Sequence, residues 1–191
     1  MLSGVILSAG EGKRMGGFPK ALLKIEGRTF LEIICENLFL ADIKHVYVVL
    51  GYYADMIKEY LPLKKERILI NPDPKRGQLS SLQLAITSIP SEVKAIMVTL
   101  VDLPLVKLST YVKLVKEGFK KIDLIHLPVY KCRRGHPVIF PRRFFQSLLD
   151  TPYEEGARSV VRANTGEVMT WNVDDPGIFM DFDTVEEYEK R

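Results

Sequence analysis

Short apolar runs alternate with helical segments along most of the chain, and this alternation limits the folds that it can adopt. The apolar, mostly β-branched runs cover residues 4–8, 45–50, 67–70, 95–100 and 123–129. Between them, apolar residues at helical spacing predict helices over residues 29–41, 54–61, 78–89 and 108–119. Strands that are apolar throughout are typical of parallel sheets covered on both faces. The sequence therefore predicts an α/β fold with a mainly parallel sheet between two layers of helices.

The C-terminal part breaks this alternation. Residues 136–140 and 168–173 predict two strands of a small β extension around two short helices, and residues 185–190 predict a closing helix. No repeat, linker or low-complexity stretch divides the chain, so we expect a single domain over residues 1–191. In sheets of this kind, ligands bind beyond the carboxyl ends of the strands. The segments that follow the strands are therefore where functional residues are expected.

Composition excludes several classes of protein. A hydrophobic fraction of 47% and a charged fraction of 27% are ordinary for globular domains and exclude disordered, fibrous and coiled-coil chains. The net charge of +3 is too small for a strong nucleic-acid footprint, and no apolar run approaches the ~20 residues that cross a bilayer. Cys35 and Cys132 are far apart and are predicted to be free thiols. We expect a cytoplasmic protein without nucleic-acid or membrane partners.

A glycine-rich segment follows the first predicted strand. Its glycines let backbone N–H groups approach phosphate oxygens, and its cations complement a polyphosphate. It is neither a dinucleotide-binding G-x-G-x-x-G, because Met15 stands at the last glycine position, nor a Walker A loop, because it lacks G-K-[ST]. A flexible connection with solvated charges is the alternative. The candidate nucleotide-binding residues here are Leu7, Ser8, Ala9, Gly10, Gly12, Lys13, Arg14 and Lys20.

Acidic residues at one predicted strand end and near the C-terminus suit a divalent metal. Asp102 follows the strand over residues 95–100, although an Asp before Leu-Pro also suits a helix cap or a turn. Asp181 and Asp183 alternate along an extended segment and are expected to face the same side. Mg²⁺ prefers one or two carboxylates together with phosphates and water. Asp102 with Asp181 or Asp183 is therefore the predicted metal site, with either of the two as second ligand.

Two further segments carry candidate ligand-binding residues. Residues 71–81 place a turn, a glycine and two serines at the start of a predicted helix, which suits either a nucleotide base and ribose or a plain turn and cap. Residues 133–137 join two arginines to a histidine, and we interpret them as a grip on an anionic acceptor. The three histidines lack ligand spacing, so zinc is not expected. The candidates are Asn71, Gly77, Ser80 and Ser81 for the nucleotide, and Arg133, Arg134 and His136 for the acceptor.

With these motifs in place, the chain resembles the MobA-like nucleotidyltransferases, most closely the molybdenum cofactor cytidylyltransferase branch. The resemblance covers nearly the whole chain in order. It comprises L-x-A-G-x-G-x-R-M-G…K (7–20), N-P-x-x-x-x-G-x-x-S-S-L (71–82), D-x-P (102–104), R-G-H-P-V-x-F (134–140) and D-x-D-T (181–184). The first motif is shared by many nucleotidyltransferases, whereas all five in this order are much more specific. The resemblance implies a Rossmann-like three-layer sandwich of the nucleotide-diphospho-sugar transferase type.

The activity implied by the resemblance is transfer of CMP from CTP to the phosphate of molybdopterin, with release of pyrophosphate and a requirement for Mg²⁺. It places the triphosphate on Ala9, Gly10, Gly12 and Arg14, and Lys20 near the α-phosphate. It places Mg²⁺ on Asp102 with Asp183 or Asp181, and the base near Asn71 and residues 77–81. Arg14, Lys20 and Asp102 are then the catalytic residues. A molybdoenzyme or a maturation factor is the implied transient partner.

Several alternatives remain open at the level of sequence. The spacing between Arg14 and Lys20 is one residue longer than is usual in the cytidylyl branch and matches the guanylyl branch, so GTP is an alternative donor. Ser8 replaces the small residue, alanine or glycine, that is common in the family. The acceptor could instead be a sugar or polyol phosphate. A non-catalytic nucleotide-binding protein that delivers a cofactor is the alternative from another class.

Overall fold

The computed structural model describes residues 1–61, 66–182 and 185–189, apart from the side chains of Arg14, Val185 and Glu186. Its main sheet has eight strands, seven of them in the order β10-β7-β9-β6-β1-β4-β5, with β8 paired to β7. β1, β4, β5 and β6 are mutually parallel, as the apolar runs predicted. The strands are β1 (Leu2–Ser8), β4 (Val46–Leu50), β5 (Arg67–Ile70), β6 (Ala95–Leu100), β7 (Ile125–Tyr130), β8 (Arg133–Arg134), β9 (Val138–Pro141) and β10 (Val168–Asn172). A separate hairpin pairs β2 (Lys24–Ile25) with β3 (Arg28–Thr29).

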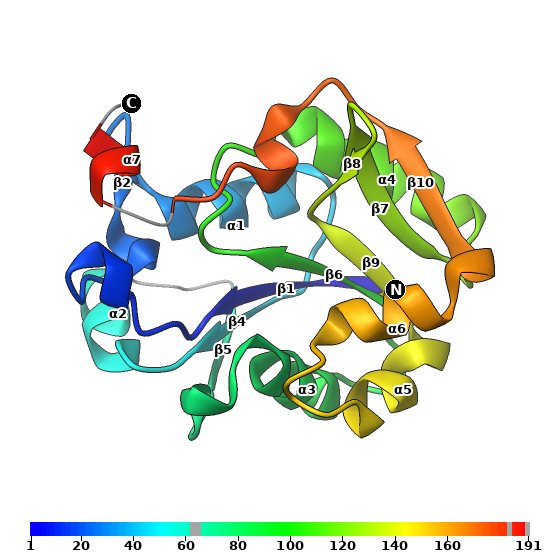
Figure 1. Cartoon of the computed structure of the whole chain (residues 1–191), viewed down its shortest axis with the longest axis horizontal. Coiled ribbons are helices and arrows are strands. Elements are labelled where there is room, and N and C mark those ends of the chain that lie inside the picture. Colours follow the sequence, from blue (N-terminus) through cyan, green and yellow to red (C-terminus); the bar gives the residue numbers. More distant parts are fainter. Residues whose placement is uncertain (62–65, 183–184, 190–191) are drawn as a thin grey trace.

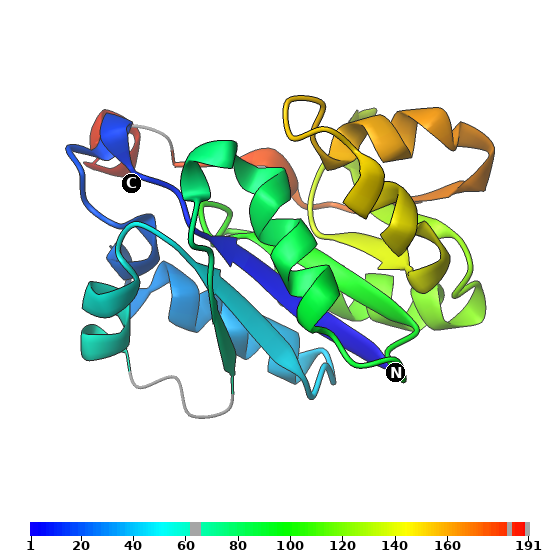
Figure 2. The same cartoon turned by 90° about the horizontal axis from the view of Figure 1, so that it is seen from below.

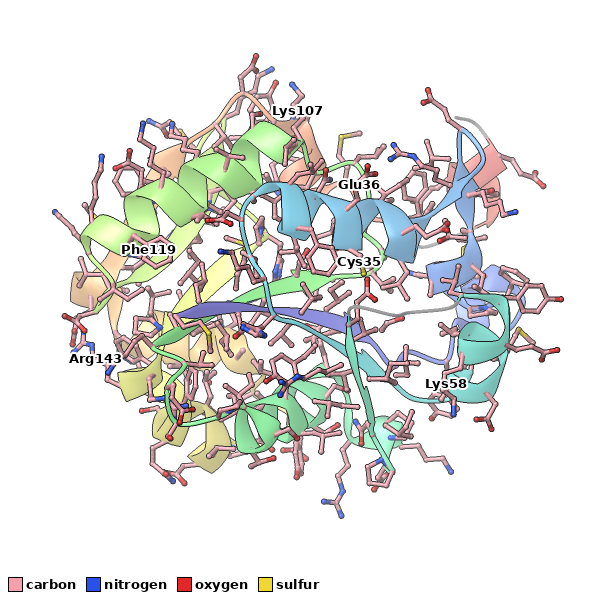
Figure 3. All side chains as sticks on the ribbon, turned by 180° about the vertical axis from the view of Figure 1, so that it is seen from behind. Cys35, Glu36, Lys58, Lys107, Phe119 and Arg143 are labelled. Carbon is pink, nitrogen blue, oxygen red and sulfur yellow. The ribbon has the colours of Figure 1, made fainter. Side chains whose placement is uncertain are left out.

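Helices cover both faces of the sheet, so the three predicted layers are present (Figure 1). Figure 2 shows α3, α5 and α6 over one face, and Figure 3 turns α1 and α4 of the other face toward the reader. The helices are α1 (Phe30–Leu40), α2 (Ala54–Tyr60), α3 (Gln78–Ser88), α4 (Leu108–Lys120), α5 (Phe145–Asp150), α6 (Ala157–Ala163) and α7 (Val185–Glu189). Short 3₁₀ turns are η1 (Lys13–Met15), η2 (Lys20–Leu22), η3 (Pro74–Arg76), η4 (Arg142–Phe144), η5 (Thr165–Glu167) and η6 (Pro176–Phe179).

Alternating side chains of the central strands build two hydrophobic cores. Along β1, Ile6 packs with the α1 residues Phe30 and Leu38 on one face. Val5 and Leu7 point the other way and pack with Leu79 and Leu82 of α3. Each such side chain, fully buried, contributes about 1.5–3 kcal/mol by leaving water. Both faces of the central strands are therefore mostly apolar, with Ser3 and Thr99 as buried polar exceptions.

The two strands of the predicted β extension near the C-terminus, β9 and β10, are part of the main sheet. β9 lies between β6 and β7 and is antiparallel to both, and β10 pairs in parallel with β7 at the sheet edge. Trp171 Nε1 of β10 donates a hydrogen bond to Nδ1 of His126 on β7, at 3.0 Å, and the two rings stack. α5 and α6 connect β9 to β10 across the α3 face of the sheet.

The two cysteines are free, as predicted. Cys35 is buried and faces the sheet from α1 (Figure 3), whereas Cys132 is exposed. Burial raises the pKa of the Cys35 thiol, and the nearby carboxylate of Glu66 raises it further. Within the described residues, no helix has the length and apolar character that crossing a membrane requires.

Candidate active site

A cavity of about 370 Å³ opens where the parallel strands β1 and β6 end. The strand ends place the glycine-rich segment on one side of it and the start of α3 on the other. Most of the residues that the sequence assigned to the nucleotide line this space. They are Leu7, Ser8, Ala9, Gly10, Gly12, Lys13, Lys20, Gly77 and Ser81, and Asp102 lines it too.

The glycine-rich segment is folded tightly on itself. Gly12 has a φ of +64°, and a Cβ there would lie 2.6 Å from the carbonyl oxygen of Phe18. The amides of Met15 and Gly17 both donate to the carbonyl of Gly12, at 2.8 and 3.1 Å. Only glycine fits this position without strain. The backbone of Arg14 lies in η1, and its side chain is outside the described part of the structure.

The segment that follows β4 holds the glycine-rich segment from outside. The hydroxyl of Tyr53 donates to the carbonyl oxygen of Glu11 at 2.9 Å. Gly51 sits so close that a Cβ would lie 2.6 Å from the carbonyl oxygen of Ala9. These contacts argue against the alternative of a flexible connection, because the loop backbone is packed and hydrogen-bonded.

Asp102 and Lys20 form an ion pair between β6 and the end of the glycine-rich segment. Lys20 Nζ lies 3.2 Å from Asp102 Oδ2, and the two side chains are only 16% and 24% exposed. The other oxygen, Oδ1, is buried and has no hydrogen-bond partner among the described residues. A buried acceptor without a partner costs about 1–3 kcal/mol unless a ligand or an ion supplies one. Asp102, which lines the cavity, therefore has one buried carboxylate oxygen without a partner among the described residues.

The C-terminal segment reaches this same point. The amide of Phe182 donates to the carbonyl of Asp102 at 3.2 Å, and the Phe182 ring packs 5.0 Å from that of Phe30 in the core. Asp181 is exposed and, like Asp102, lines a second, larger cavity. Asp183 lies outside the described residues. Asp102 and Asp181 thus line one cavity, and the choice of Asp181 or Asp183 as a second metal ligand stays a prediction.

The residues present fit a magnesium ion better than a zinc ion. Across residues 1–61, 66–182 and 185–189, no group of three or more His, Cys, Asp or Glu side chains is placed to hold a metal. Mg²⁺ needs only one or two carboxylates when substrate phosphates and water complete its coordination. The unpartnered Oδ1 of Asp102 meets that requirement.

Asn71 and Ser80 lie outside the lining of both cavities. The buried amide of Asn71 donates to the hydroxyls of Ser80 and Ser81, at 2.9 Å each, and its carbonyl oxygen accepts from the amide of Asp73. The Ser80 hydroxyl in turn donates to the carbonyl of Gly77 at 2.7 Å. Because these groups are occupied with one another, Asn71 and Ser80 fix the start of α3, and of the two serines only Ser81 reaches the smaller cavity.

A second cavity, of about 870 Å³, adjoins the first and shares Leu7, Gln78, Leu100 and Asp102 with it. All three predicted acceptor-binding residues, Arg133, Arg134 and His136, line it. The Arg133 guanidinium stacks over the Phe179 ring at 4.1 Å. Asp102 therefore stands at the junction of the two cavities.

The Arg-Gly-His segment is held against η6. The amide of His136 donates to the carbonyl of Ile178 at 2.8 Å, and a Cβ on Gly135 would lie 2.3 Å from that oxygen. His136 Nδ1 lies 3.5 Å from the carbonyl oxygen of Val98. Burial lowers the pKa of His136, and so does the charge of Arg158, whereas Val98 and Asp102 raise it. A neutral imidazole at pH 7 suits a residue that shapes the cavity wall.

The buried carboxylate of Asp175 holds the other wall of the larger cavity. It accepts hydrogen bonds from the Lys107 amide and the Thr110 hydroxyl at the start of α4, at 2.8 and 2.6 Å. It also accepts from the amide of Gly177 in η6, at 2.9 Å. These bonds tie η6, which carries Ile178 and Phe179 into the cavity wall, to α4.

Sequence reasoning missed several residues that line the cavities. Gln78 lies within residues 77–81, which the resemblance placed near the base, but it was not named as a candidate, and it lines both cavities. Arg158 and Arg162 stand four apart on α6, and this spacing places them on one side of a helix. The further residues missed in the larger cavity include Tyr153 and Glu155, in a segment that carries no motif.

Comparisons with known proteins agree with this geometry. Residues 4–168 match the family model described as the MobA-like NTP transferase domain. The chain belongs to the MobA-like NTP transferase family. It is accordingly an enzyme of the nucleotidyltransferase class, as the resemblance implied.

Relatives within and beyond the family differ in their named activities. A nicotine blue oxidoreductase from Paenarthrobacter nicotinovorans is 31% identical over 97% of this chain and 94% of its own. The molybdenum cofactor cytidylyltransferase of Escherichia coli is 24% identical over 96% of this chain and 92% of its own. A probable molybdenum cofactor guanylyltransferase from Geobacillus is 27% identical over 65% of this chain and 62% of its own.

Solved structures share the fold. Rv0371c from Mycobacterium tuberculosis superposes with a TM-score of 0.89, at 26% identity, over 99% of this chain and 95% of its own. A complex of Rv0371c with manganese superposes with a TM-score of 0.84, at 24% identity, over 99% and 96% of the two chains.

Proposed function

We propose that this nucleotidyltransferase transfers CMP from CTP to the phosphate of a molybdopterin-type acceptor and releases pyrophosphate. The observation that carries the proposal is the junction of two cavities at Asp102. The smaller cavity, faced by glycine-rich backbone, suits a triphosphate. The larger one, with arginines on its wall, suits a phosphorylated acceptor. The full-length relative named cytidylyltransferase supports CTP as donor.

The chemistry needs alignment and charge compensation more than proton transfer. The acceptor phosphate is ionised at pH 7, so no side chain has to remove a proton before it attacks. Its oxygen forms a bond to the α-phosphorus while the bond from that phosphorus to the bridging oxygen breaks, and pyrophosphate leaves with the electron pair. Lys20, beside Asp102 at the junction, is positioned to offset negative charge on the α-phosphate. Loop amides and Arg14 would hold the β- and γ-phosphates.

Asp102 and Asp181 are the described residues that would hold Mg²⁺, and Asp183 is the alternative second ligand. A bound divalent ion would neutralise phosphate charge and orient the triphosphate. The unpartnered Asp102 Oδ1 supports this assignment, as does the manganese complex of the structural neighbour. Gly77, Ser81 and Gln78 would contact the base and ribose, with Asn71 and Ser80 holding them in place.

The test is a matrix of donors and acceptors. Pyrophosphate release is measured with CTP, GTP, ATP and UTP against molybdopterin and a panel of sugar phosphates, with Mg²⁺, with Mn²⁺ and with EDTA. We expect release with CTP and molybdopterin, and none in EDTA. A preference for GTP would overturn CTP as the donor; the Arg14–Lys20 spacing and the guanylyltransferase relative favour that outcome. Pyrophosphate release with a sugar phosphate alone would overturn molybdopterin as the acceptor. Nucleotide binding without any release would favour a cofactor-delivery protein.

Redox activity is the second candidate, because a relative at 31% identity along nearly the whole chain is named an oxidoreductase. It is tested by supplying NADH or NADPH with nicotine blue and following both absorbances. Cofactor oxidation coupled to loss of the dye, together with no pyrophosphate release in the matrix, would favour this candidate over nucleotidyl transfer. We expect no such oxidation.

The proposed product passes to another protein. We expect transient contact with a molybdoenzyme or a maturation factor, and we expect the reaction to take place in the cytoplasm, without a nucleic-acid or membrane partner. Pull-down with a molybdoenzyme that requires the dinucleotide form of its cofactor tests the first expectation. Retention of the protein only in the presence of the reaction product would support it.

A further inference from the structure

The larger cavity carries arginines on two separate walls. Arg133 and Arg134 come from β8, and Arg158 and Arg162 come from α6. Figure 1 shows β8 and α6 well apart, with β9 between them. Residues four apart on a helix lie on one side of it, so the α6 pair faces the cavity together. The same cavity therefore offers cations at two places.

The α6 arginines differ from most of the described arginines, because they have no partner among the described residues. Of the described arginine side chains, most are held by a carboxylate, a carbonyl, a hydroxyl or an aromatic ring. Those held in this way are Arg28, Arg67, Arg76, Arg133, Arg142 and Arg143. Arg134, Arg158 and Arg162 make no hydrogen bond, ion pair or ring contact with any described residue, and all three line the larger cavity.

Uncompensated guanidinium groups on a concave surface attract anions. A guanidinium presents fixed pairs of donors that match carboxylate and phosphate oxygens. The negative groups on the wall of this cavity are Asp102, Asp181 and Glu155. Asp102 and Asp181 belong to the reaction end. Glu155 lies just before α6, and it forms no ion pair with Arg158 or Arg162.

The α6 arginines are separate from the place where the reacting phosphate would lie. That phosphate is expected beside Lys20 and Asp102, at the junction of the cavities. Arg158 and Arg162 line only the larger cavity, whereas Lys20 lines only the smaller one. A phosphate beside Lys20 would therefore be bound in a different cavity from the one that the α6 pair lines.

We propose that the acceptor carries a second anionic group, apart from its reacting phosphate, and that Arg158 and Arg162 bind this group. The inference rests on the proposed function, because it takes the larger cavity to be the acceptor site. It names a substrate class that the proposed function leaves open: an acceptor with two separated negative groups, the second a phosphate, a carboxylate or another compact anion.

The test uses two probes that differ by one anionic group. Binding of fructose 6-phosphate and of fructose 1,6-bisphosphate to the full chain is measured by calorimetry, without nucleotide. We expect the bisphosphate to bind at least about tenfold more tightly. In the double variant Arg158→Gln/Arg162→Gln we expect this gain to disappear. The matched control Lys116→Gln removes one positive charge from an exposed site on α4, away from both cavities, and should keep the gain.

A second variant separates the two cavities. If the bisphosphate instead bound to the glycine-rich segment, Lys13→Gln would abolish the gain while the α6 double variant kept it, and the proposal would be overturned. Equal affinity of the wild type for both probes would overturn it too. Melting curves verify that each variant is folded.

The result of the binding experiment does not depend on nucleotidyl transfer, because no nucleotide is present. Pyrophosphate release by a wild type that shows no bisphosphate gain would refute the second anionic subsite alone. An α6-dependent gain in a chain that releases no pyrophosphate with any donor would refute nucleotidyl transfer and keep the anion site. If both hold, the α6 double variant should raise the acceptor KM at least about tenfold with kcat changed much less.

Discussion

Asp102 has a charged partner on one carboxylate oxygen and none on the other. Lys20 lies 3.2 Å from Oδ2, while Oδ1 is buried without a partner among the described residues. The second oxygen of this carboxylate is therefore available to a further cation. A residue that served only as a cap or turn former would accept a hydrogen bond from a backbone amide, whereas the Asp102 carboxylate is paired with the Lys20 ammonium group. The single-residue geometry thus favours the metal assignment over the structural one.

Replacing Asp102 with Asn should abolish metal-dependent turnover while the fold persists. The amide keeps the shape but loses the charge that would hold the ion, so we expect kcat to fall by ~10³ or more. Pyrophosphate release across a Mg²⁺ titration measures the effect. Asp42→Asn, at an exposed site far from the cavities, is the control and should behave as the wild type. Near-normal turnover of the Asp102 variant would show that Asp102 does not hold the metal ion.

Lys20→Met should affect catalysis more than folding. The loss of one cation beside the reacting phosphate should lower kcat by ~10²–10³, because charge developing at the α-phosphate is no longer offset. The variant also leaves Asp102 with less compensation, so a modest loss of stability accompanies it. Single-turnover rates and thermal unfolding are measured on the same preparation. A large fall in Tm with normal activity per folded molecule would show that Lys20 is structural.

At the scale of elements, the ends of β1 and β4 hold the glycine-rich segment in shape. Gly51 follows β4 and abuts Ala9, which follows β1, and Tyr53 donates to the carbonyl of Glu11. These contacts come from a second strand that is parallel to β1 and adjacent to it. The glycine-rich segment is therefore positioned by a neighbour 40 residues away along the chain as well as by its own glycines.

Gly51→Ala should impair the reaction through the loop. The added Cβ would lie 2.6 Å from the carbonyl oxygen of Ala9 and 2.8 Å from its Cβ, so the loop backbone must shift. We expect kcat/KM for the nucleotide to fall at least about tenfold, since small displacements of positioning groups are costly in catalysis. Gly166→Ala is the matched control, because its Cβ would meet no atom within 4 Å. Equal effects of the two substitutions would contradict the positioning role.

At the scale of the whole molecule, the buried His126 of β7 is hydrogen-bonded to the edge strand β10. His126 on β7 accepts a hydrogen bond from Trp171 at Nδ1, while its Nε2 lies 2.8 Å from the carbonyl oxygen of Lys121. One ring nitrogen accepts and the other donates, so this arrangement requires the neutral imidazole. Burial lowers the pKa of His126, partly opposed by the carbonyl of Lys121. Folding thus disfavours its protonation.

Stability should therefore fall as the pH drops below about 6.5, the ordinary pKa of histidine in an unfolded chain. Below that pH the unfolded chain binds a proton that the folded chain resists, and stability decreases until the folded-state pKa is reached. Urea unfolding between pH 5.5 and 7.5 measures this slope. In His126→Gln we expect a smaller slope, with the remainder due to His136, whose pKa is also lowered. An unaltered slope in His126→Gln would contradict this account.

Much of the fold followed from local pattern. The strands over residues 67–70 and 95–100 and the start of each central helix lie where periodicity placed them. The C-terminal strands were found as elements, but their places in the sheet depended on pairing with β6 and β7. The hydrophobic period of a strand does not predict which strand it pairs with, because any apolar strand can add to an open edge of a sheet. The site showed the same division: residues at strand ends were found, and those of α6 were missed.

The sequence by itself determined the α/β class, the glycine-rich segment after β1 and the acid after β6, because burial periodicity and backbone requirements are local properties. Only the tertiary structure decided what these residues do together. It joined the amide of Phe182 to the carbonyl of Asp102, and it turned the Asn71 amide toward two serines. It also placed two arginines of α6, without a partner among the described residues, on the wall of the larger cavity. Distances between residues remote along the chain depend on how the layers pack, and packing is a property of the whole fold.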